Sequence, residues 1–365
     1  MESTARDDAY MREALRLAAK GRGRTSPNPM VGAVIVDGRG AVVGSGYHER
    51  AGGDHAEVRA LAEAGAAARG ATLYCTLEPC CHHGRTGPCV DRIVEAALAR
   101  VVVAMPDPNP VVNGRGIESL RRRGIRVDAG VRECEATRLN EAFVTWVSRR
   151  RPFVTMKVAA SLDGCIAARP GARTTLTSPA AGRAVHAQRA EVDAIGVGST
   201  TVLVDDPLLT ARGARRALPL TRAVFDRRLR TPPTARLFGT LESGPVVVVA
   251  VESASARHRE RLARLTDAGA EVECVDAGGF LRNAFERLAR RRVTSLVLEG
   301  GRLVHEAAWE AGLVDRVQMF VAPVEVGPSG VAWMDRDAVF RAVDALAVRA
   351  LGPDVLMEAD VHGTR

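Results

Sequence analysis

Hydrophobic positions in the first 150 residues recur with two different periods. Apolar residues at helical spacing from Tyr10 to Ala18 predict a helix over residues 5–20. Two apolar runs follow at residues 31–38 and 40–48, and the glycines between them predict a β-hairpin. Strand patterns at 71–79, 100–105 and 125–130 then alternate with helical patterns at 55–68, 90–100, 117–123 and 132–147. This alternation predicts an α/β domain with helices on both faces of its sheet.

The pattern breaks at residues 148–152, Ser-Arg-Arg-Arg-Pro, and a second series of elements begins there. Strand patterns lie at 153–161, 192–199, 222–226, 245–251, 271–275, 295–301, 315–324, 344–352 and 354–360, with helical stretches between most of them. The Arg- and Pro-rich residues 213–236 are expected to form surface loop around one buried strand. We therefore predict two α/β domains, residues 1–150 and 151–365, and the chain length favours the same division.

The composition is that of a globular protein, with 46% hydrophobic and 26% charged residues. No run approaches about 18 apolar residues, so no membrane span is expected. The charged N-terminus lacks the apolar segment of a signal peptide. We therefore expect a cytoplasmic protein whose seven cysteines are thiols or metal ligands.

The formal net charge of +8 favours an anionic partner. The arginines are spread along the whole chain, and only 4% of residues are aromatic, which leaves few platforms for stacked bases. The balance favours an anionic small molecule over nucleic acid. Only two of the basic residues are lysines, Lys20 and Lys157.

Candidate metal ligands gather in "TLEPCCHHGRTGPC", residues 76–89, and in "DHAEV" upstream of it. A catalytic zinc ion takes three protein ligands and leaves its fourth position to water, and His55, Cys80 and Cys89 supply such a set. Both cysteines are expected near helix or turn N-termini, which favour thiolate. The pattern His-x-Glu followed by Pro-Cys and a second Cys is typical of zinc-dependent base deaminases, in which the Glu, here Glu57, transfers protons. The chemistry would be hydrolytic deamination.

Other arrangements of these donors stay open. Cys80 and Cys89 could form a closed structural site with His82 or His83, although Glu57 would then have no role. Adjacent residues rarely bind one ion well, so Cys81 is assigned to packing or to the loop. The remaining cysteines are expected to be buried small side chains: Cys75, Cys134, Cys165 and Cys274.

Four segments of the first half, "SPNPMVGAVIV", "GYHERAGGDHAEV", "TLEPCCHHGRTGPC" and "DPNPVVNGRG", resemble the bacterial bifunctional riboflavin-biosynthesis deaminase/reductase family, RibD. The second half resembles the reductase domain of that family in "MKVAASLDG", "GVGSTTVLVDDPLLTAR", "LVLEGG" and "AGLVD". The resemblance covers nearly the whole chain in the same order. It implies an N-terminal cytidine-deaminase-like α/β/α domain and a C-terminal dihydrofolate-reductase-like α/β domain.

The implied activity has two steps. A zinc-dependent deamination acts on 2,5-diamino-6-(5-phosphoribosylamino)pyrimidin-4(3H)-one, and an NADPH-dependent reduction then converts the ribosyl group of the product to a ribityl chain. The resemblance assigns His55, Cys80 and Cys89 to zinc and Glu57 to proton transfer. It also implies homo-oligomers, and no nucleic-acid or membrane partner.

The resemblance further assigns binding residues. Those around the pyrimidine and its phosphoribosyl tail are Asn28, His48, Arg85, Asp107 and Asn109. Those along the substrate of the reductase are Arg173, Arg189, Leu209, Arg212 and Glu299. Those along NADPH are Ala159, Thr175, Thr201, Asp205, Gly300 and Gly301. Lys157, with Asp163 in the same motif, is expected to contact the sugar that receives the hydride, and Arg227 or Arg228 to bind the extra phosphate of NADPH.

Strand-turn patterns support a nucleotide cofactor independently of the resemblance. The segments "AIGVGSTTVL" and "LVLEGGRLVHEA" each run from a strand through a glycine turn towards a helix N-terminus, where backbone N–H groups can receive phosphate oxygens. The turn at Gly196 and Gly198 lacks the third glycine of the dinucleotide fingerprint, so it is weak evidence alone.

The chain departs from the family at Thr175, where Trp is usual, at Arg173, where Ser is usual, and at Cys81 and Gly87 in the zinc loop. These departures keep open a deaminase whose second domain is inactive or has another substrate. A nucleic-acid-editing deaminase is a further alternative, based on the basic charge.

Overall fold

The computed structural model describes residues 2–82 and 87–361. The chain divides into two compact units, with the boundary between Arg150 and Arg151. The first unit is built on a five-stranded sheet in the order β2-β1-β3-β4-β5. Its strands are β1 (Gly32–Val36), β2 (Val42–Tyr47), β3 (Thr72–Leu77), β4 (Arg100–Met105) and β5 (Arg126–Ala129). β1 pairs antiparallel with β2 and β3, whereas β3, β4 and β5 run parallel. The predicted hairpin and strands are confirmed.

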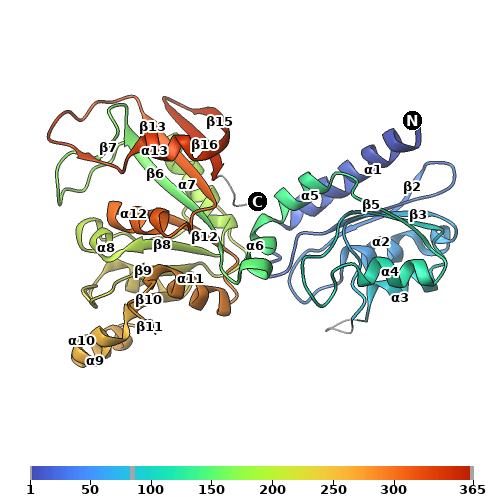
Figure 1. Cartoon of the computed structure of the whole chain (residues 1–365), viewed down its shortest axis with the longest axis horizontal. Helices are drawn as coiled ribbons and strands as arrows, with labels where there is room; N and C mark the ends of the chain where they lie inside the picture. The colour runs from blue at the N-terminus through green and yellow to red at the C-terminus, as the bar shows by residue number, and fades with distance from the viewer. Residues whose placement is uncertain (1, 83–86, 362–365) are drawn as a thin grey trace. The chain divides into compact units, whose positions relative to one another are not determined.

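Helices cover both faces of this sheet, as predicted from the alternation of patterns (Figure 1). They are α1 (Glu2–Ala18), α2 (Ala56–Ala64), α3 (Cys89–Glu95), α4 (Arg115–Arg122) and α5 (Glu133–Leu139). A further helix, α6 (Glu141–Arg149), follows α5 and contacts it. α1 lies so close to β1 that a Cβ atom on Gly32 would come within 2.0 Å of the Ala14 carbonyl oxygen. The backbones of helix and strand therefore touch at this point.

Two helix predictions need correction. The helix expected over 132–147 is two helices, because the chain turns at Asn140, whose amide side chain hydrogen-bonds both the N–H and the carbonyl of Met30. The helix expected over 90–100 ends at Glu95. Ala97 adopts a left-handed conformation there, φ 53°, which redirects the chain into β4.

The second unit contains a nine-stranded sheet in the order β11-β10-β9-β8-β12-β6-β13-β16-β15. The first seven strands in this order are parallel, and the last two are antiparallel. Their bounds are β6 (Phe153–Ser161), β8 (Ala194–Gly198), β9 (Thr221–Phe225), β10 (Val246–Val251), β11 (Ala270–Val275), β12 (Ser295–Gly300), β13 (Arg316–Ala322), β15 (Val343–Leu351) and β16 (Asp354–Val361). Each strand predicted from the pattern in this half is present.

The helices of the second unit lie between most of these strands in sequence (Figure 1). They are α7 (Pro179–Glu191), α8 (Ser199–Asp205), α9 (Glu252–Arg257), α10 (Arg259–Asp267), α11 (Phe280–Arg290), α12 (Arg302–Glu310) and α13 (Arg336–Arg341). A small sheet of β7 (Cys165–Ala167) and β14 (Val331–Ala332) was not predicted, because two or three residues are too few to show a period. Among the helices of the described residues, none is long and apolar enough to cross a membrane.

The contact between α1 and β1 allows a stability test. Gly32→Ala would force a Cβ atom into the α1 backbone, and we expect it to lower the free energy of unfolding of the first unit by about 3 kcal/mol. Gly38→Ala, in the hairpin turn, is the matched control because no atom lies within 4 Å of its added Cβ. We expect the control to change stability by less than about 0.5 kcal/mol in urea unfolding. Equal effects of the two changes would contradict this account of the packing.

Candidate active sites in the two units

Three potential metal ligands meet where α2 and α3 begin. His55 is the N-cap residue of α2, and Cys89 is the first residue of α3. The Nδ1 atom of His55 lies 3.1 Å from Sγ of Cys89 and 3.5 Å from Sγ of Cys80, and the donor atoms of all three residues lie within 4.8 Å of one another. His82 is not part of this group, and His83 lies outside the described residues.

This donor set fits zinc. Ligands at about 2.0–2.3 Å in a tetrahedral array lie about 3.3–3.8 Å apart, close to the separations of His55 from the two sulfurs. One imidazole nitrogen and two thiol sulfurs are donors that zinc prefers. Three ligands also leave one position open, as a catalytic site requires.

Electrostatics at the two cysteines favour a bound cation. Hydrogen bonds from Cys89 and His55 lower the pKa of Cys80 to about 4, and the backbone N–H of Cys89 donates to its sulfur at 3.3 Å. The negative Cys80 thiolate, together with burial, raises the pKa of Cys89. Two thiols this close cannot both ionise without a positive charge beside them, and a metal ion supplies that charge.

Glu57 lies in the first turn of α2, two residues after His55, and is almost fully buried. Burial raises the pKa of its carboxyl group, and the nearby His55 partly offsets this rise. A carboxyl group with a raised pKa can both accept and return a proton near neutral pH. A buried carboxyl group with a raised pKa therefore lies beside the three potential metal ligands.

Asn28 and His48 form a second polar group close to the ligands. The Nδ2 atom of Asn28 lies 3.1 Å from Nε2 of His48, whose Nδ1 lies 3.0 Å from the carbonyl oxygen of Asp54. This network assigns the proton to Nδ1, so Nε2 accepts from Asn28. Burial lowers the pKa of His48, which favours the neutral ring. The rings of His48 and His55 meet edge to face at 5.7 Å between centroids.

Asp107 and Asn109 lie just beyond the carboxyl end of β4. The Oδ1 atom of Asp107 accepts a hydrogen bond from the Asn109 N–H at 2.9 Å. Burial raises the pKa of Asp107 to about 6, and the charge of Cys80 contributes to the rise. Asn28, His48, Asp107 and Asn109 thus lie in the region of the potential metal ligands, and their role in binding the pyrimidine stays a prediction. Arg85 lies outside the described residues.

The remaining cysteines take no part in this donor group. Cys75 and Cys165 are buried, as expected, and Cys81 and Cys274 are half-buried. Cys134 is exposed on α5, so the expectation of a buried side chain was wrong there. The helical period of this short helix did not indicate which side would face solvent.

In the second unit, Arg189, Glu299 and Lys157 form a group of enclosed charges. Arg189 near the end of α7 donates to both carboxylate oxygens of Glu299 on β12, at 2.7 and 2.6 Å. Burial raises the pKa of Glu299, but the charge and hydrogen bonds of Arg189, with Lys157, outweigh it and lower the pKa overall. Burial also lowers the pKa of Lys157 on β6, whose Nζ lies 5.3 Å from the centre of the Phe320 ring.

The other residues predicted for the reductase substrate are less closely grouped. Arg189 donates to the carbonyl oxygen of Thr210, in the segment that carries Leu209 and Arg212. The backbone N–H of Arg212 donates to Nδ1 of His186, and its side chain is exposed. Leu209 is buried with a φ of 53°. Arg173 is exposed on the loop before α7.

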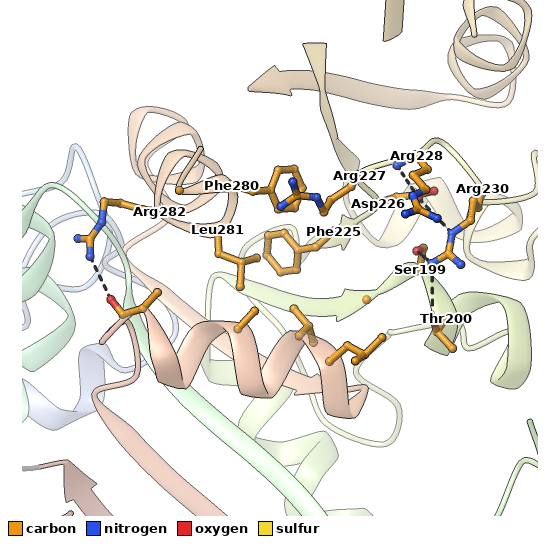
Figure 2. Close-up of a pocket in the computed structure, with 16 residues that line it drawn as sticks. Ser199, Thr200, Phe225, Asp226, Arg227, Arg228, Arg230, Phe280, Leu281 and Arg282 are labelled. Carbon is orange, nitrogen blue, oxygen red and sulfur yellow. Dashed lines mark hydrogen bonds and ion pairs between the residues drawn. The ribbon is translucent and has the colours of Figure 1, made fainter. Parts of the chain in front are cut away.

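A cleft of about 470 Å³ opens beyond the carboxyl ends of β8 and β9 (Figure 2). Its walls come from the start of α8, the turn after β9, the start of α11 and one side of α12. Arg227 lies over the ring of Phe280, 5.0 Å from its centre, and Arg228 points into the same region (Figure 2). Both arginines expected at the cofactor phosphate therefore line the cleft.

Arg230 and Phe280 are among the lining residues that the sequence did not lead us to name. Arg230 donates to Oγ of Ser199 at 2.7 Å and so connects the β9 turn to the start of α8. Phe280 provides the aromatic surface under Arg227. Arg230 stands two residues after Arg228 in "FDRRLR", so the same cluster of arginines was the available signal.

The six residues expected along the cofactor are not among those that line this cleft, but several lie on its bordering elements. Thr201 is on α8, with its Oγ1 atom 3.2 Å from the position of a Cβ on Gly301. Gly300 ends β12 and Gly301 is the N-cap residue of α12. Asp205 ends α8, where burial raises the pKa of its carboxyl group. Ala159 is half-buried on β6, and Thr175 is exposed.

Residues 4–105 match the family model of the cytidine and deoxycytidylate deaminase zinc-binding region, and residues 152–357 match that of the RibD C-terminal domain. The riboflavin biosynthesis protein RibD of Aquifex aeolicus is 42% identical over 88% of either chain. The RibD protein of Synechocystis is 39% identical over 98% of this chain and 97% of its own.

Solved structures give the same result. The structure of RibD from Acinetobacter baumannii is similar over 98% of this chain and 99% of its own, with a TM-score of 0.87 and 35% identity. A structure from Thermotoga maritima, described as a diaminohydroxyphosphoribosylaminopyrimidine deaminase/5-amino-6-(5-phosphoribosylamino)uracil reductase, has a TM-score of 0.84 and 34% identity over the same shares of the two chains.

The fold, the group of three potential metal ligands and the matches to known proteins together define a bifunctional enzyme. It has a zinc-binding deaminase domain followed by a reductase domain. The chain belongs to the RibD family of riboflavin biosynthesis.

The raised pKa of Asp107 allows a test of the first site. The pKa rises on folding from its ordinary value of 3.8 to about 6, so the folded state favours the protonated form. The resulting cost to stability is small below pH 4 and grows to about 2–3 kcal/mol as the pH rises through 6. We expect Asp107→Asn to stabilise the first unit in urea unfolding at pH 8 and to change it little at pH 4. Stabilisation that is the same at both pH values would contradict this interpretation.

Proposed function

We propose that this chain catalyses two successive reactions. The first is hydrolytic deamination of 2,5-diamino-6-(5-phosphoribosylamino)pyrimidin-4(3H)-one, and the second is NADPH-dependent reduction of the ribosyl group of the product to a ribityl chain. The observation that carries the proposal is the group of His55, Cys80 and Cys89 with the buried carboxyl group of Glu57 beside it. The family membership of the whole chain supports the second step.

In the first step, His55, Cys80 and Cys89 would hold the zinc ion, which when bound would activate a water molecule as a nucleophile near neutral pH. Glu57 would take one proton from this water and pass it to a ring nitrogen as the amine-bearing carbon is attacked. It would then take the second proton from the new hydroxyl group and pass it to the departing amine, which leaves as ammonia while the carbon becomes a carbonyl. The raised pKa of Glu57 supports its action both as a proton acceptor and as a proton donor.

The pyrimidine is bound by the polar groups around the ligands. Asn28 and His48 present an amide and a neutral imidazole, and Asp107 and Asn109 present further amide and carboxyl groups. Such groups match the alternating donors and acceptors of an aminopyrimidinone edge. By the sequence resemblance, Arg85 would bind the phosphate.

In the second step, the cleft beyond β8 and β9 binds the adenosine end of NADPH. Arg227 and Arg228, assisted by Arg230, surround the extra phosphate, because guanidinium groups bind phosphate oxygens through charge-assisted hydrogen bonds. The remaining cofactor contacts are assigned to Ala159, Thr175, Thr201, Asp205, Gly300 and Gly301. Thr201 and Gly301 adjoin each other, which supports a shared phosphate contact there.

We place the hydride-transfer part of the second site next to Lys157. NADPH, when bound, would supply the hydride for C1′ of the sugar, whose bond to the ring oxygen opens. The ring oxygen then needs a proton, and Lys157 is the proposed donor, held beside Glu299 and Arg189. Arg173, Arg189 and Arg212 are the proposed anion contacts of this substrate, and Leu209 packs beside them.

A paired assay tests the two activities on zinc-loaded protein. We expect ammonia release from the diaminopyrimidine substrate, followed by NADPH oxidation. Glu57→Gln removes the proton carrier and should lower ammonia release at least about 1,000-fold. It should leave NADPH oxidation unchanged when the deaminated intermediate is supplied.

Lys157→Met is the reciprocal variant, since a side chain of similar length without a charge should abolish NADPH oxidation and spare ammonia release. Ammonia release without NADPH oxidation in the unmodified protein would contradict the proposed second step. It would favour a second domain that is inactive or has another substrate. The exposed Thr175, without a bulky ring at the cofactor, would then be the first place to search for the cause.

The assignment of the extra phosphate is tested by cofactor preference. Arg228→Gln should raise KM for NADPH about tenfold and leave KM for NADH unchanged, because only NADPH carries the phosphate. Arg282→Gln is the matched control, since Arg282 lines the same cleft but donates to the carbonyl oxygen of Ala311 (Figure 2). A similar loss with both cofactors would contradict the assignment.

A further inference from the structure

A buried carboxylate that has no role in the proposed chemistry lies between the sheet and the metal ligands of the first unit. Glu78 follows β3 directly and precedes Cys80 by two residues, and it is almost fully buried. It belongs to "TLEPC", but the sequence reasoning assigned it no function.

Four backbone N–H groups donate to the carboxylate of Glu78. Oε2 accepts from Asp107 at 3.0 Å and from Gly114 at 2.8 Å. Oε1 accepts from Gly116 at 2.8 Å and from Ile117 at 3.1 Å. Charge-assisted hydrogen bonds of this kind are stronger than neutral ones, and leaving the donors unpaired would be costly.

These four donors stand at the two ends of one loop. Asp107 lies where the chain leaves β4, and Gly114 to Ile117 form the beginning of α4. The first N–H groups of a helix have no partners within it, and a carboxylate at this end is favourable. A single side chain therefore closes residues 107–117 into a loop with both ends fixed.

The loop approaches the metal-ligand segment closely at a glycine. A Cβ atom on Gly116 would lie 2.1 Å from the carbonyl oxygen of Pro79 and 3.1 Å from Oε1 of Glu78. Any larger residue would push the start of α4 away from Glu78. The packing thus depends on the absence of a side chain at this position.

Asp107 and Asn109, the proposed pyrimidine contacts on this side of the site, belong to the closed loop. Within it, Asp107 accepts from the Asn109 N–H and Asn109 accepts from the Val111 N–H at 3.1 Å. These internal bonds define the shape of the loop. Among the hydrogen bonds of the described residues, those to Glu78 join both of its ends to the segment that carries Cys80.

We infer that Glu78 is a positioning residue of the deaminase site, which fixes the loop of Asp107 and Asn109 relative to the metal ligands and so determines affinity for the pyrimidine. The inference rests on the proposed function of the first unit. Glu78 is not one of the three potential metal ligands, and its two carboxylate oxygens accept hydrogen bonds from the loop. Its effect reaches the substrate through the loop.

The test is Glu78→Gln, which keeps the size of the side chain but turns an NH₂ group towards N–H donors. We expect KM for the diaminopyrimidine to rise at least tenfold, with kcat within threefold of the unmodified enzyme. Zinc content by mass spectrometry should stay at one ion per chain. NADPH oxidation with the deaminated intermediate should also be unchanged.

Glu118→Gln is the matched control, because Glu118 is an exposed carboxylate in the first turn of the same helix. We expect it to leave KM unchanged. The inference would be overturned if KM were unchanged in Glu78→Gln. It would also be overturned if this variant lost zinc or kcat with no rise in KM, or if KM rose equally in the control Glu118→Gln. If the unmodified protein releases no ammonia, the proposed function fails instead.

Hydrogen exchange tests the same inference without activity, and applies even if Glu78→Gln does not fold. In the unmodified protein, the amides of Asp107, Gly114, Gly116 and Ile117 should exchange at least 100-fold more slowly than the same amides would in an unfolded chain. Fast exchange of those four amides would overturn the inference. Gly116→Ala, which displaces the loop from the other side, should raise KM in the same way as Glu78→Gln, and an unchanged KM would overturn it.

Discussion

Leu77 of β3 pairs with Met105 of β4 in parallel register, so the two chains leave the sheet side by side. The Glu78 N–H donates to the carbonyl oxygen of Met105 immediately beyond that pair. The segment with Cys80 and the segment with Asp107 must therefore lie together, because parallel strands end at the same edge. The first site depends on this pairing, since it brings metal ligands and proposed substrate contacts from distant parts of the sequence into one place.

Both units contain buried charged groups that need a partner of opposite charge. In the first unit, the thiols of Cys80 and Cys89 can both ionise only beside a cation, which explains why the donor group is suited to a metal. In the second unit, Glu299 stays ionised inside the protein because Arg189 holds it through two hydrogen bonds. Such pairs are weak sources of net stability, since removing two charges from water is costly. Their position at the carboxyl ends of parallel strands, where ligands bind in α/β proteins, fits a functional role.

The period of hydrophobic residues predicted most strands and helices, including every strand of the large sheet. It failed at the ends of two helices. Asn140 ends a helix because its side chain binds Met30, 110 residues away in sequence, and no local pattern carries that information. Ala97 adopts a left-handed conformation at the end of α3, although alanine is a good helix former.

Periodicity and residue chemistry are local properties, so the sequence alone was enough to predict the two-unit architecture, the family and a candidate set of three metal donors. His55, Cys80 and Cys89 could be selected from seven cysteines and eight histidines by spacing and by donor type. The pairing of polar groups, in contrast, follows from the fold. The four N–H donors at Glu78, the contact of Arg230 with Ser199 and the ion pair of Arg189 with Glu299 each join residues at least 29 positions apart. Such partners depend on strand order and close approach of backbones, which a linear pattern does not contain.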